Sequence, residues 1–106
     1  MASIRIAVPR EAAAGEAIEL KAIIQHRMES GFRRDSRGEV VPRDILTEFV
    51  CLLDGEEMFR ADFFPGVAAN PFLTFPIVAE RSGTLEFRWT DQHGTVFAET
   101  RPLTVA

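Results

Sequence analysis

The segment L-E-F-R-W-T-D-Q-H-G-T, residues 85–95, decides the fold class of this chain. Its first six residues alternate apolar and polar side chains, which is typical of a strand that packs one face on a core. A polar turn ending in glycine follows, and residues 95–104 continue as the second arm of a hairpin. This hairpin indicates a β protein, and the rest of the chain repeats its pattern.

Apolar side chains recur with a period of two along most of the sequence. We expect further strands near residues 4–8, 17–24, 45–53, 58–63 and 73–77, separated by turn signals. A helix-prone run before the second strand is limited to a turn by Gly15. Seven short strands without a convincing helix predict an all-β fold, an immunoglobulin-like antiparallel β-sandwich, as a single domain over residues 1–106.

The composition excludes several classes of protein. With 46% hydrophobic and 26% charged residues, the chain is too apolar to be disordered. No apolar run approaches the roughly 18 residues that a membrane span needs. The pI near 5.1 argues against general nucleic-acid binding. The first residues lack a basic region followed by an apolar core, so we expect no secretory signal, which by itself favours the cytoplasm.

Two stretches are too apolar for an ordinary half-buried sheet. In the third expected strand both faces are apolar, with Leu46, Val50 and Leu52 on the outer one, so we expect the outer face to be covered, plausibly by another chain. The stretch 59–77 adds five phenylalanines around three prolines, and we expect Phe64 and Phe72 to be exposed. The alternative is that phenylalanine simply fills the core of a domain without tyrosine. The candidate partner interface comprises Phe49, Val50, Leu52, Phe64 and Phe72.

The longest segment without strand character lies between the second and third expected strands. Residues 26–43, HRMESGFRRDSRGEVVPR, show no apolar periodicity, and long loops in small domains are usually functional. Five arginines against three carboxylates give this loop a formal charge of +2, so the remaining body carries −6. Such a loop favours docking of an anion or an acidic partner surface. The five are Arg27, Arg33, Arg34, Arg37 and Arg43.

A purely structural role for these arginines stays open. They could clamp an anion through bidentate hydrogen bonds, or they could pair with Glu29, Asp35 and Glu39 and hold the loop folded. Metal binding by His26, Glu29 and Asp35 is not supported, because the spacing of a metal site is missing. We expect the His26 imidazole to bond the loop backbone and His93, in a turn, to be solvated.

No residues of the chain point to catalysis. No serine lies beside a credible base, and no glycine-rich phosphate cradle is present, so a hydrolase is not supported. The lone Cys51 excludes an internal disulfide and is expected to be a small buried hydrophobe. The alternative, a reactive thiol, requires exposure and a positive neighbour, whereas the nearby Glu48 and Asp54 would raise the pKa of the thiol. We therefore expect neither an enzyme, a metal nor a cofactor.

Over essentially its whole length the chain resembles the SoxZ family, the smaller subunit of the SoxYZ sulfur carrier of bacterial thiosulfate oxidation. The most specific part is the loop, where the family pattern is close to H-x-M-E-[ST]-G-x-R-x-D-x-x-G-x-x-[IV]-P-R. Arg27 departs from it where many members carry proline. Further matches are V-P at residues 8–9, A-N-P-F at 69–72 and F-x-W-T-D-x-x-G at 87–94. The loop matches are His26, Met28, Glu29, Ser30, Gly31, Arg33, Asp35, Gly38, Val41, Pro42 and Arg43.

This resemblance implies a sandwich bound to SoxY, whose C-terminal cysteine carries covalent sulfur intermediates. The family member supplies no catalytic residue; it stabilises SoxY and helps to dock the other Sox enzymes, so Cys51 is not the carrier thiol. It also implies a periplasmic location reached by co-export with a signal-bearing SoxY, in place of the cytoplasm. The competing interpretation is a generic immunoglobulin-like binding module unrelated to sulfur metabolism. The candidate docking loop comprises His26, Met28, Glu29, Arg33, Arg34, Asp35 and Arg43.

The resemblance gives the arginines a testable role. If they dock enzymes or steer the anionic adduct, replacing Arg33 and Arg34 by alanine should slow the downstream enzymes more at low than at high ionic strength.

Overall fold

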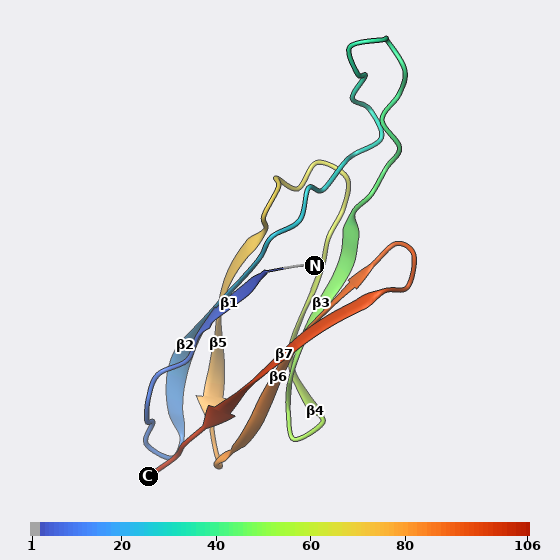
Figure 1. Cartoon of the computed structure of the whole chain (residues 1–106). Helices are drawn as coiled ribbons and strands as arrows, with labels where there is room; N and C mark the ends of the chain where they lie inside the picture. The colour runs from blue at the N-terminus through green and yellow to red at the C-terminus, as the bar shows by residue number, and fades with distance from the viewer. Residues whose placement is uncertain (1–2) are drawn as a thin grey trace.

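Seven strands and no helix make up the regular structure of residues 3–106, the part of the chain that this computed structural model describes (Figure 1). The prediction of an all-β chain with about seven strands is confirmed. No helix of the described residues is therefore long and apolar enough to cross a membrane. The strands are β1 Ile4–Ala7, β2 Glu16–Ile24, β3 Leu46–Leu53, β4 Glu56–Asp62, β5 Phe72–Ala79, β6 Gly83–Asp91 and β7 Val96–Leu103.

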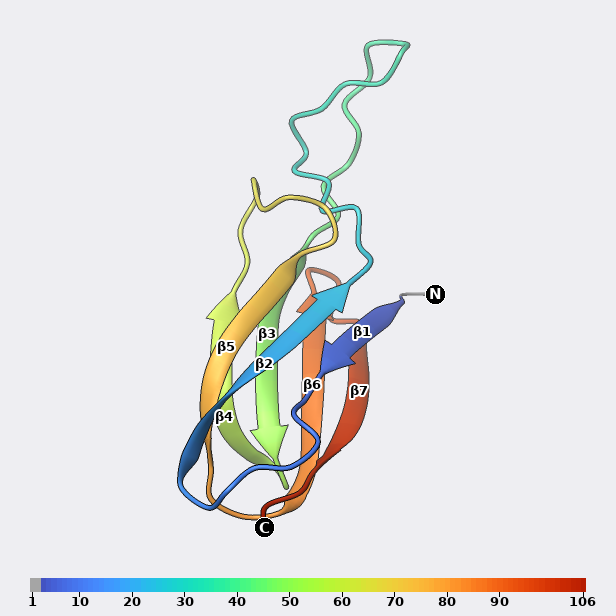
Figure 2. The same cartoon turned by 90° about the vertical axis from the view of Figure 1, so that its left-hand side faces the viewer.

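The strands form two antiparallel sheets that pack face to face as an immunoglobulin-like sandwich. The three-stranded sheet has the order β1-β2-β5 and lies in front in Figure 2. The four-stranded sheet behind it has the order β4-β3-β6-β7. Each pair of neighbours is antiparallel. The period of two therefore aims alternate side chains into the space between the sheets.

An aromatic cluster fills that space. Phe49 and Trp89 are both fully buried, and their ring centroids lie 4.9 Å apart. From the opposite sheet Phe75 approaches Phe49 at 5.5 Å and stacks on Phe59 at 4.3 Å. Since large buried aromatic side chains contribute most of the apolar area of a small core, this cluster is the centre of the sandwich.

A register shift in β3 changes which side chains reach the outer face. The shift lies between Leu46 and Glu48, and Leu46 is fully buried in the core. The expected outer row of β3 is therefore wrong at this end, because alternation does not reveal a bulge. Val50 does lie on the outer face, and it is only 5% exposed. It stands opposite Arg60 on one neighbouring strand and Arg88 on the other.

Side chains of the same chain thus cover Val50. The apolar stems of cross-strand arginines can lie over a small side chain while their charged ends stay in water. Arg60 hydrogen-bonds the carboxylates of Glu48 and Glu57 on the same face. The outer surface of the four-stranded sheet is consequently charged and largely paired with itself, which does not require a partner to cover it.

Candidate docking loop and partner surface

The segment between β2 and β3 projects far beyond the sandwich (Figure 1). It makes the molecule elongated, with extents of 58 × 21 × 20 Å. Two isolated antiparallel bridges, Glu29 with Asp44 and Arg34 with Val40, hold its outgoing and returning arms side by side. The segment predicted to be an irregular loop is thus a braced, hairpin-like projection.

A reciprocal pair of hydrogen bonds fixes the base of the projection. The backbone N–H of His26 donates to the side-chain Oδ1 of Asn70 at 2.9 Å. The backbone N–H of Asn70 in turn donates to the carbonyl oxygen of His26 at 2.7 Å. Asn70 has a positive φ of 53°, which asparagine tolerates better than most residues. The loop base is thereby tied to the connection between β4 and β5.

Met28 is the point at which the loop enters the core. It has a φ of 52° and is only 6% exposed, and its Sδ lies 3.3 Å from the backbone nitrogen of Leu46. The N–H of Met28 donates to Nδ1 of His26 at 2.9 Å. The prediction that the His26 imidazole bonds the loop backbone is confirmed. Burial of Met28 was not predicted, because the loop sequence around it is polar.

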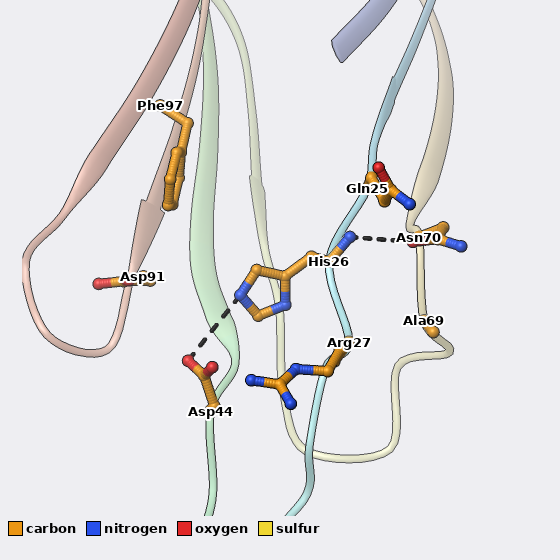
Figure 3. A pocket seen from close by; sticks show the side chains of 8 residues that line it. All are labelled: Gln25, His26, Arg27, Asp44, Ala69, Asn70, Asp91 and Phe97. Carbon is orange, nitrogen blue, oxygen red and sulfur yellow. Dashed lines mark hydrogen bonds and ion pairs between the residues drawn. The ribbon is translucent and has the colours of Figure 1, made fainter. Parts of the chain in front are cut away.

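The hydrogen bond to Nδ1 also decides what His26 can do chemically. In the neutral ring the hydrogen must then reside on Nε2. Nε2 faces Asp44, with 3.9 Å to Oδ1 (Figure 3). Nε2 of His93 approaches the same oxygen at 3.8 Å. A metal bound at Nε2 would have to displace that hydrogen. Among the described residues no group of three or more potential ligands is placed to hold a metal ion.

These residues border an open groove of ≈ 650 Å³ at the loop base (Figure 3). Arg27 lies on its rim together with the carboxylates of Asp44 and Asp91. Opposite charges on one rim do not select an anion or a cation. We therefore assign the groove no ligand. The His93 side chain beside it is 60% exposed, so the prediction that this residue is solvated is confirmed.

An ion pair stiffens the middle of the projection. Arg33 donates from Nη2 to Oε1 of Glu29 at 2.7 Å and from Nε to both carboxylate oxygens at 3.2 Å. This hydrogen bonding lowers the pKa of Glu29 and raises the pKa of Arg33. Gly31 beside the pair has a φ of 89°, and a Cβ there would lie 3.1 Å from Cβ of Arg43. The two arms are therefore closely packed at this level.

The distal turn is closed by Asp35. Its Oδ1 accepts hydrogen bonds from the backbone N–H groups of Arg37 at 2.8 Å and Glu39 at 3.0 Å. Arg34 donates from Nη1 to the carbonyl oxygen of Gly38 at 2.8 Å. Such side-chain bonds to nearby backbone groups are the usual way in which aspartate fixes a turn.

The five arginines thus divide into two groups. Arg33 and Arg34 are engaged within the loop, and Arg43 donates to the side chain of Gln92 at 3.1 Å. Arg27 and Arg37 make no ion pair or side-chain hydrogen bond with the described residues. Of the two roles left open by the sequence, holding the loop folded applies to Arg33 and Arg34. Arg27 and Arg37 keep their charged groups available.

Two apolar side chains on the projection point into solvent. Phe32 is 82% exposed and Val40 is 49% exposed. Phe32 is the most exposed of the large apolar side chains in the described part of the chain. It was not among the predicted docking residues, because the prediction rested on charge and Phe32 is the one aromatic residue of a polar segment.

The sandwich itself exposes apolar side chains on the three-stranded sheet. Phe72 is 58% and Val78 is 45% exposed, both on the outward face of β5. Ile23 on β2 stands opposite Phe72 and is partly buried. Phe64, in the adjoining connection, is 65% exposed. The expected exposure of Phe64 and Phe72 is confirmed, whereas their contact with a partner stays a prediction.

The remaining predicted interface residues lie elsewhere. Phe49 is fully buried in the core, so it cannot contact a partner and we remove it from the candidate interface. Val50 and Leu52 lie on the charged face of the other sheet, with Leu52 paired to Glu57 and Glu86. Since a partner seats on exposed apolar area rather than on paired charges, the three-stranded sheet is the better candidate surface.

Cys51 lies inside the sandwich as a free thiol. Burial raises its pKa to about 12, because the thiolate would lose its hydration. The expected cause, nearby carboxylates, is not the main one. A cysteine of this kind is a small apolar side chain of the core.

Comparison with known proteins places the chain in a family. The family described as "Sulphur oxidation protein SoxZ" matches residues 4–102, which include every strand up to most of β7. No curated protein matches the chain.

Solved structures share the fold at low sequence identity. The superoxide reductase (neelaredoxin) from Ignicoccus hospitalis is 16% identical, with a TM-score of 0.68, over 98% of this chain and 80% of that one. The sulfur carrier protein SoxY from Chlorobium limicola f thiosulfatophilum is 12% identical, with a TM-score of 0.68, over 97% of this chain and 78% of that one. At these identities the likeness demonstrates the fold alone.

Proposed function

The chain belongs to the SoxZ family and hence to the Sox sulfur oxidation system, and from this premise we propose that it is the non-catalytic subunit of a SoxYZ carrier. In this role it binds and stabilises SoxY, whose C-terminal cysteine carries the covalent sulfur intermediates. It takes no part in the chemistry and helps to dock the enzymes that process the carried group.

The observation that carries this proposal is the set of exposed apolar side chains on the outward face of the three-stranded sheet, which lie on either side of the ion pair of Lys21 and Glu19. Phe72 and Val78 leave large parts of their side chains in contact with water, which disfavours a solitary sandwich. Covering them would give the core of a subunit interface. An obligate interface typically buries roughly 2,000 Å² or more in total, so a sheet face rather than a single loop must supply it.

The burial of Cys51 supports the assignment of the carrier thiol to SoxY. A carrier thiol must reach several enzymes in turn and must ionise to attack a sulfur compound. Cys51 is fully buried and its pKa is raised to about 12. We therefore assign the carrier function to SoxY and not to this chain.

The projecting loop supports the docking role. Its base is tied to Asn70 and its middle is braced by the pair of Glu29 and Arg33, so its distal part is presented at a fixed position. A partner seated on the sheet face would leave this distal part free. Arg37 on the distal turn and Arg27 at the base give the projection positive charge for steering acidic enzymes or the anionic adduct.

We place the complex in the periplasm, exported together with a SoxY that bears the signal. The resemblance to the family and the need of the carrier to meet its enzymes support this part of the proposal. Export in a folded complex requires that the two subunits associate beforehand, which fits an apolar, obligate interface.

Size-exclusion chromatography with light scattering tests the proposal. The chain is produced alone and together with the SoxY of the same organism. We expect a stable complex of the two, and a lone chain that self-associates through its exposed sheet face. A well-behaved monomer that ignores SoxY would show that the chain is a different kind of binding module.

A further inference from the structure

We propose that Phe32 is an anchor residue that inserts into an apolar pocket, ringed by carboxylates, on an enzyme of the Sox system. This inference rests on the docking role proposed above and specifies its chemistry. The binding partner is a protein, because a single exposed aromatic ring on a positively charged projection is best bound by an apolar pocket with an acidic rim.

The first argument is the exposure of Phe32. Phe32 is 82% exposed, so its own chain buries little of its ring. Exposing so large an apolar ring to water is unfavourable in proportion to the exposed apolar area. The other exposed phenylalanines, Phe64 and Phe72, belong to the sandwich end and to the sheet face assigned to SoxY. Phe32 lies on the projection and needs a different partner.

The second argument is the rigidity of its support. The backbone N–H of Phe32 donates to Oγ of Ser30 at 3.2 Å. On the following residue, Arg33, the carbonyl oxygen accepts from the N–H of Val41 at 2.8 Å and the side chain is held by Glu29. With backbone bonds on both sides, little conformational entropy is lost when the ring is captured. Aromatic side chains are common hot spots of interfaces, and here the backbone that carries the ring is already fixed.

The third argument is the charge around the ring. Residues 26–43 carry +2 on a body of −6. Arg37, beyond the ring on the distal turn, has no ion pair or side-chain hydrogen bond with the described residues. An acidic rim would pair with Arg37 and would be repelled by the rest of this chain, so it directs an enzyme to the projection and away from the sandwich.

The test measures binding of each purified Sox enzyme of the same organism to this chain, immobilised both alone and in its complex with SoxY. The variants are Phe32→Ala, Arg37→Ala and the matched control Val96→Ala. Val96 is 51% exposed but lies on β7, outside the projection. Binding and dissociation rates are recorded at low and at high ionic strength.

For at least one enzyme we expect Phe32→Ala to weaken binding by about tenfold or more, mainly through faster dissociation. We expect Arg37→Ala to slow association at low ionic strength and to have little effect at high. Val96→Ala should bind like the unmodified chain. Binding of Phe32→Ala within about twofold of the control for every enzyme would overturn the proposal.

A fourth variant separates this inference from the proposed function. In it, residues 32–40 are replaced by a short turn containing glycine. If this variant loses enzyme binding while Phe32→Ala keeps it, the loop docks without an aromatic anchor and only the present inference fails. If neither variant loses binding, the docking role of the loop fails as well.

Discussion

His26 and Asn70 form two hydrogen bonds with each other although they are 44 residues apart in sequence. The backbone N–H of His26 donates to Oδ1 of Asn70, and the backbone N–H of Asn70 donates to the carbonyl oxygen of His26. This pair joins the projecting loop to the connection between β4 and β5. The same connection carries Phe64 and leads into Phe72. One local pair thus links the two surfaces to which we assign different partners.

Replacing Asn70 should loosen this link in a way that depends on the new residue. Asn70→Ala removes the acceptor and places a Cβ-bearing residue without side-chain compensation at φ 53°, which should cost about 2 kcal/mol of unfolding free energy. Asn70→Gly removes the acceptor alone and should cost about 1 kcal/mol. Urea denaturation of both variants measures the difference. An alanine variant as stable as the glycine variant would contradict the strained backbone at this position.

The pair of Glu29 and Arg33 should make the order of the loop depend on acidity. Hydrogen bonding to Arg33 lowers the pKa of Glu29 in the folded state, so the pair stabilises the loop above the unfolded-state pKa. This stabilisation is lost as the pH falls through the lowered folded pKa. We expect the backbone amides of Glu29, Val41 and Asp44 to exchange hydrogen faster, relative to intrinsic rates, once the pH falls below about 4.

Glu29→Gln should remove this acid sensitivity, with the same amides already less protected at neutral pH. Glu39→Gln is the matched control, because the Glu39 carboxylate makes no ion pair with the described residues. Equal pH profiles for the unmodified chain and Glu29→Gln would show that the pair does not hold the loop.

Cys51 should be unreactive in the folded chain. With the pKa raised to about 12, only about one thiol in ten thousand is ionised at pH 8, and burial blocks access as well. We expect iodoacetamide to leave Cys51 unmodified in the native protein and to alkylate it fully in guanidinium chloride. Rapid stoichiometric labelling of the native chain would restore Cys51 as a candidate carrier thiol.

Charge on the three-stranded sheet should weaken assembly with SoxY. Phe72→Asp would bury a carboxylate in an apolar interface, and we expect at least a tenfold loss of affinity by light scattering of titrated mixtures. The control is Val96→Asp, which adds the same charge on the other sheet. Since both positions are about half exposed, neither variant should unfold the chain. Equal loss in the two variants would place the interface elsewhere.

The sequence was sufficient for the strands because each turns one face toward the core, and a period of two in the apolar residues records that fact directly. It failed at Leu46, where a bulge changes the face without any signal in the pattern. It failed again at Met28 and Phe32. Which loop side chain enters the core and which points to solvent depends on tertiary packing at the loop base, and neighbouring residues do not encode it.

Only part of the candidate site could be predicted, because the rest again depends on tertiary contacts. The missing apolar periodicity located the loop, and its opposite charges suggested that its arginines could pair with Glu29, Asp35 and Glu39. Charge alone could not distinguish an engaged arginine such as Arg34 from a free one such as Arg37, because the difference lies in a backbone carbonyl brought close by the distal turn. The contact of the loop with Asn70 joins residues separated in sequence by the whole of β3 and β4, so it has no local signal.

The central claim is that SoxY covers the three-stranded sheet and leaves the projection free. Hydroxyl-radical footprinting of the chain alone and in its complex with SoxY tests this directly, because exposed phenylalanines react readily. Phe72 should lose most of its oxidation in the complex, whereas Phe32 and Val96 should be oxidised to the same extent in both samples. Undiminished oxidation of Phe72, with protection at Val96 instead, would contradict the account.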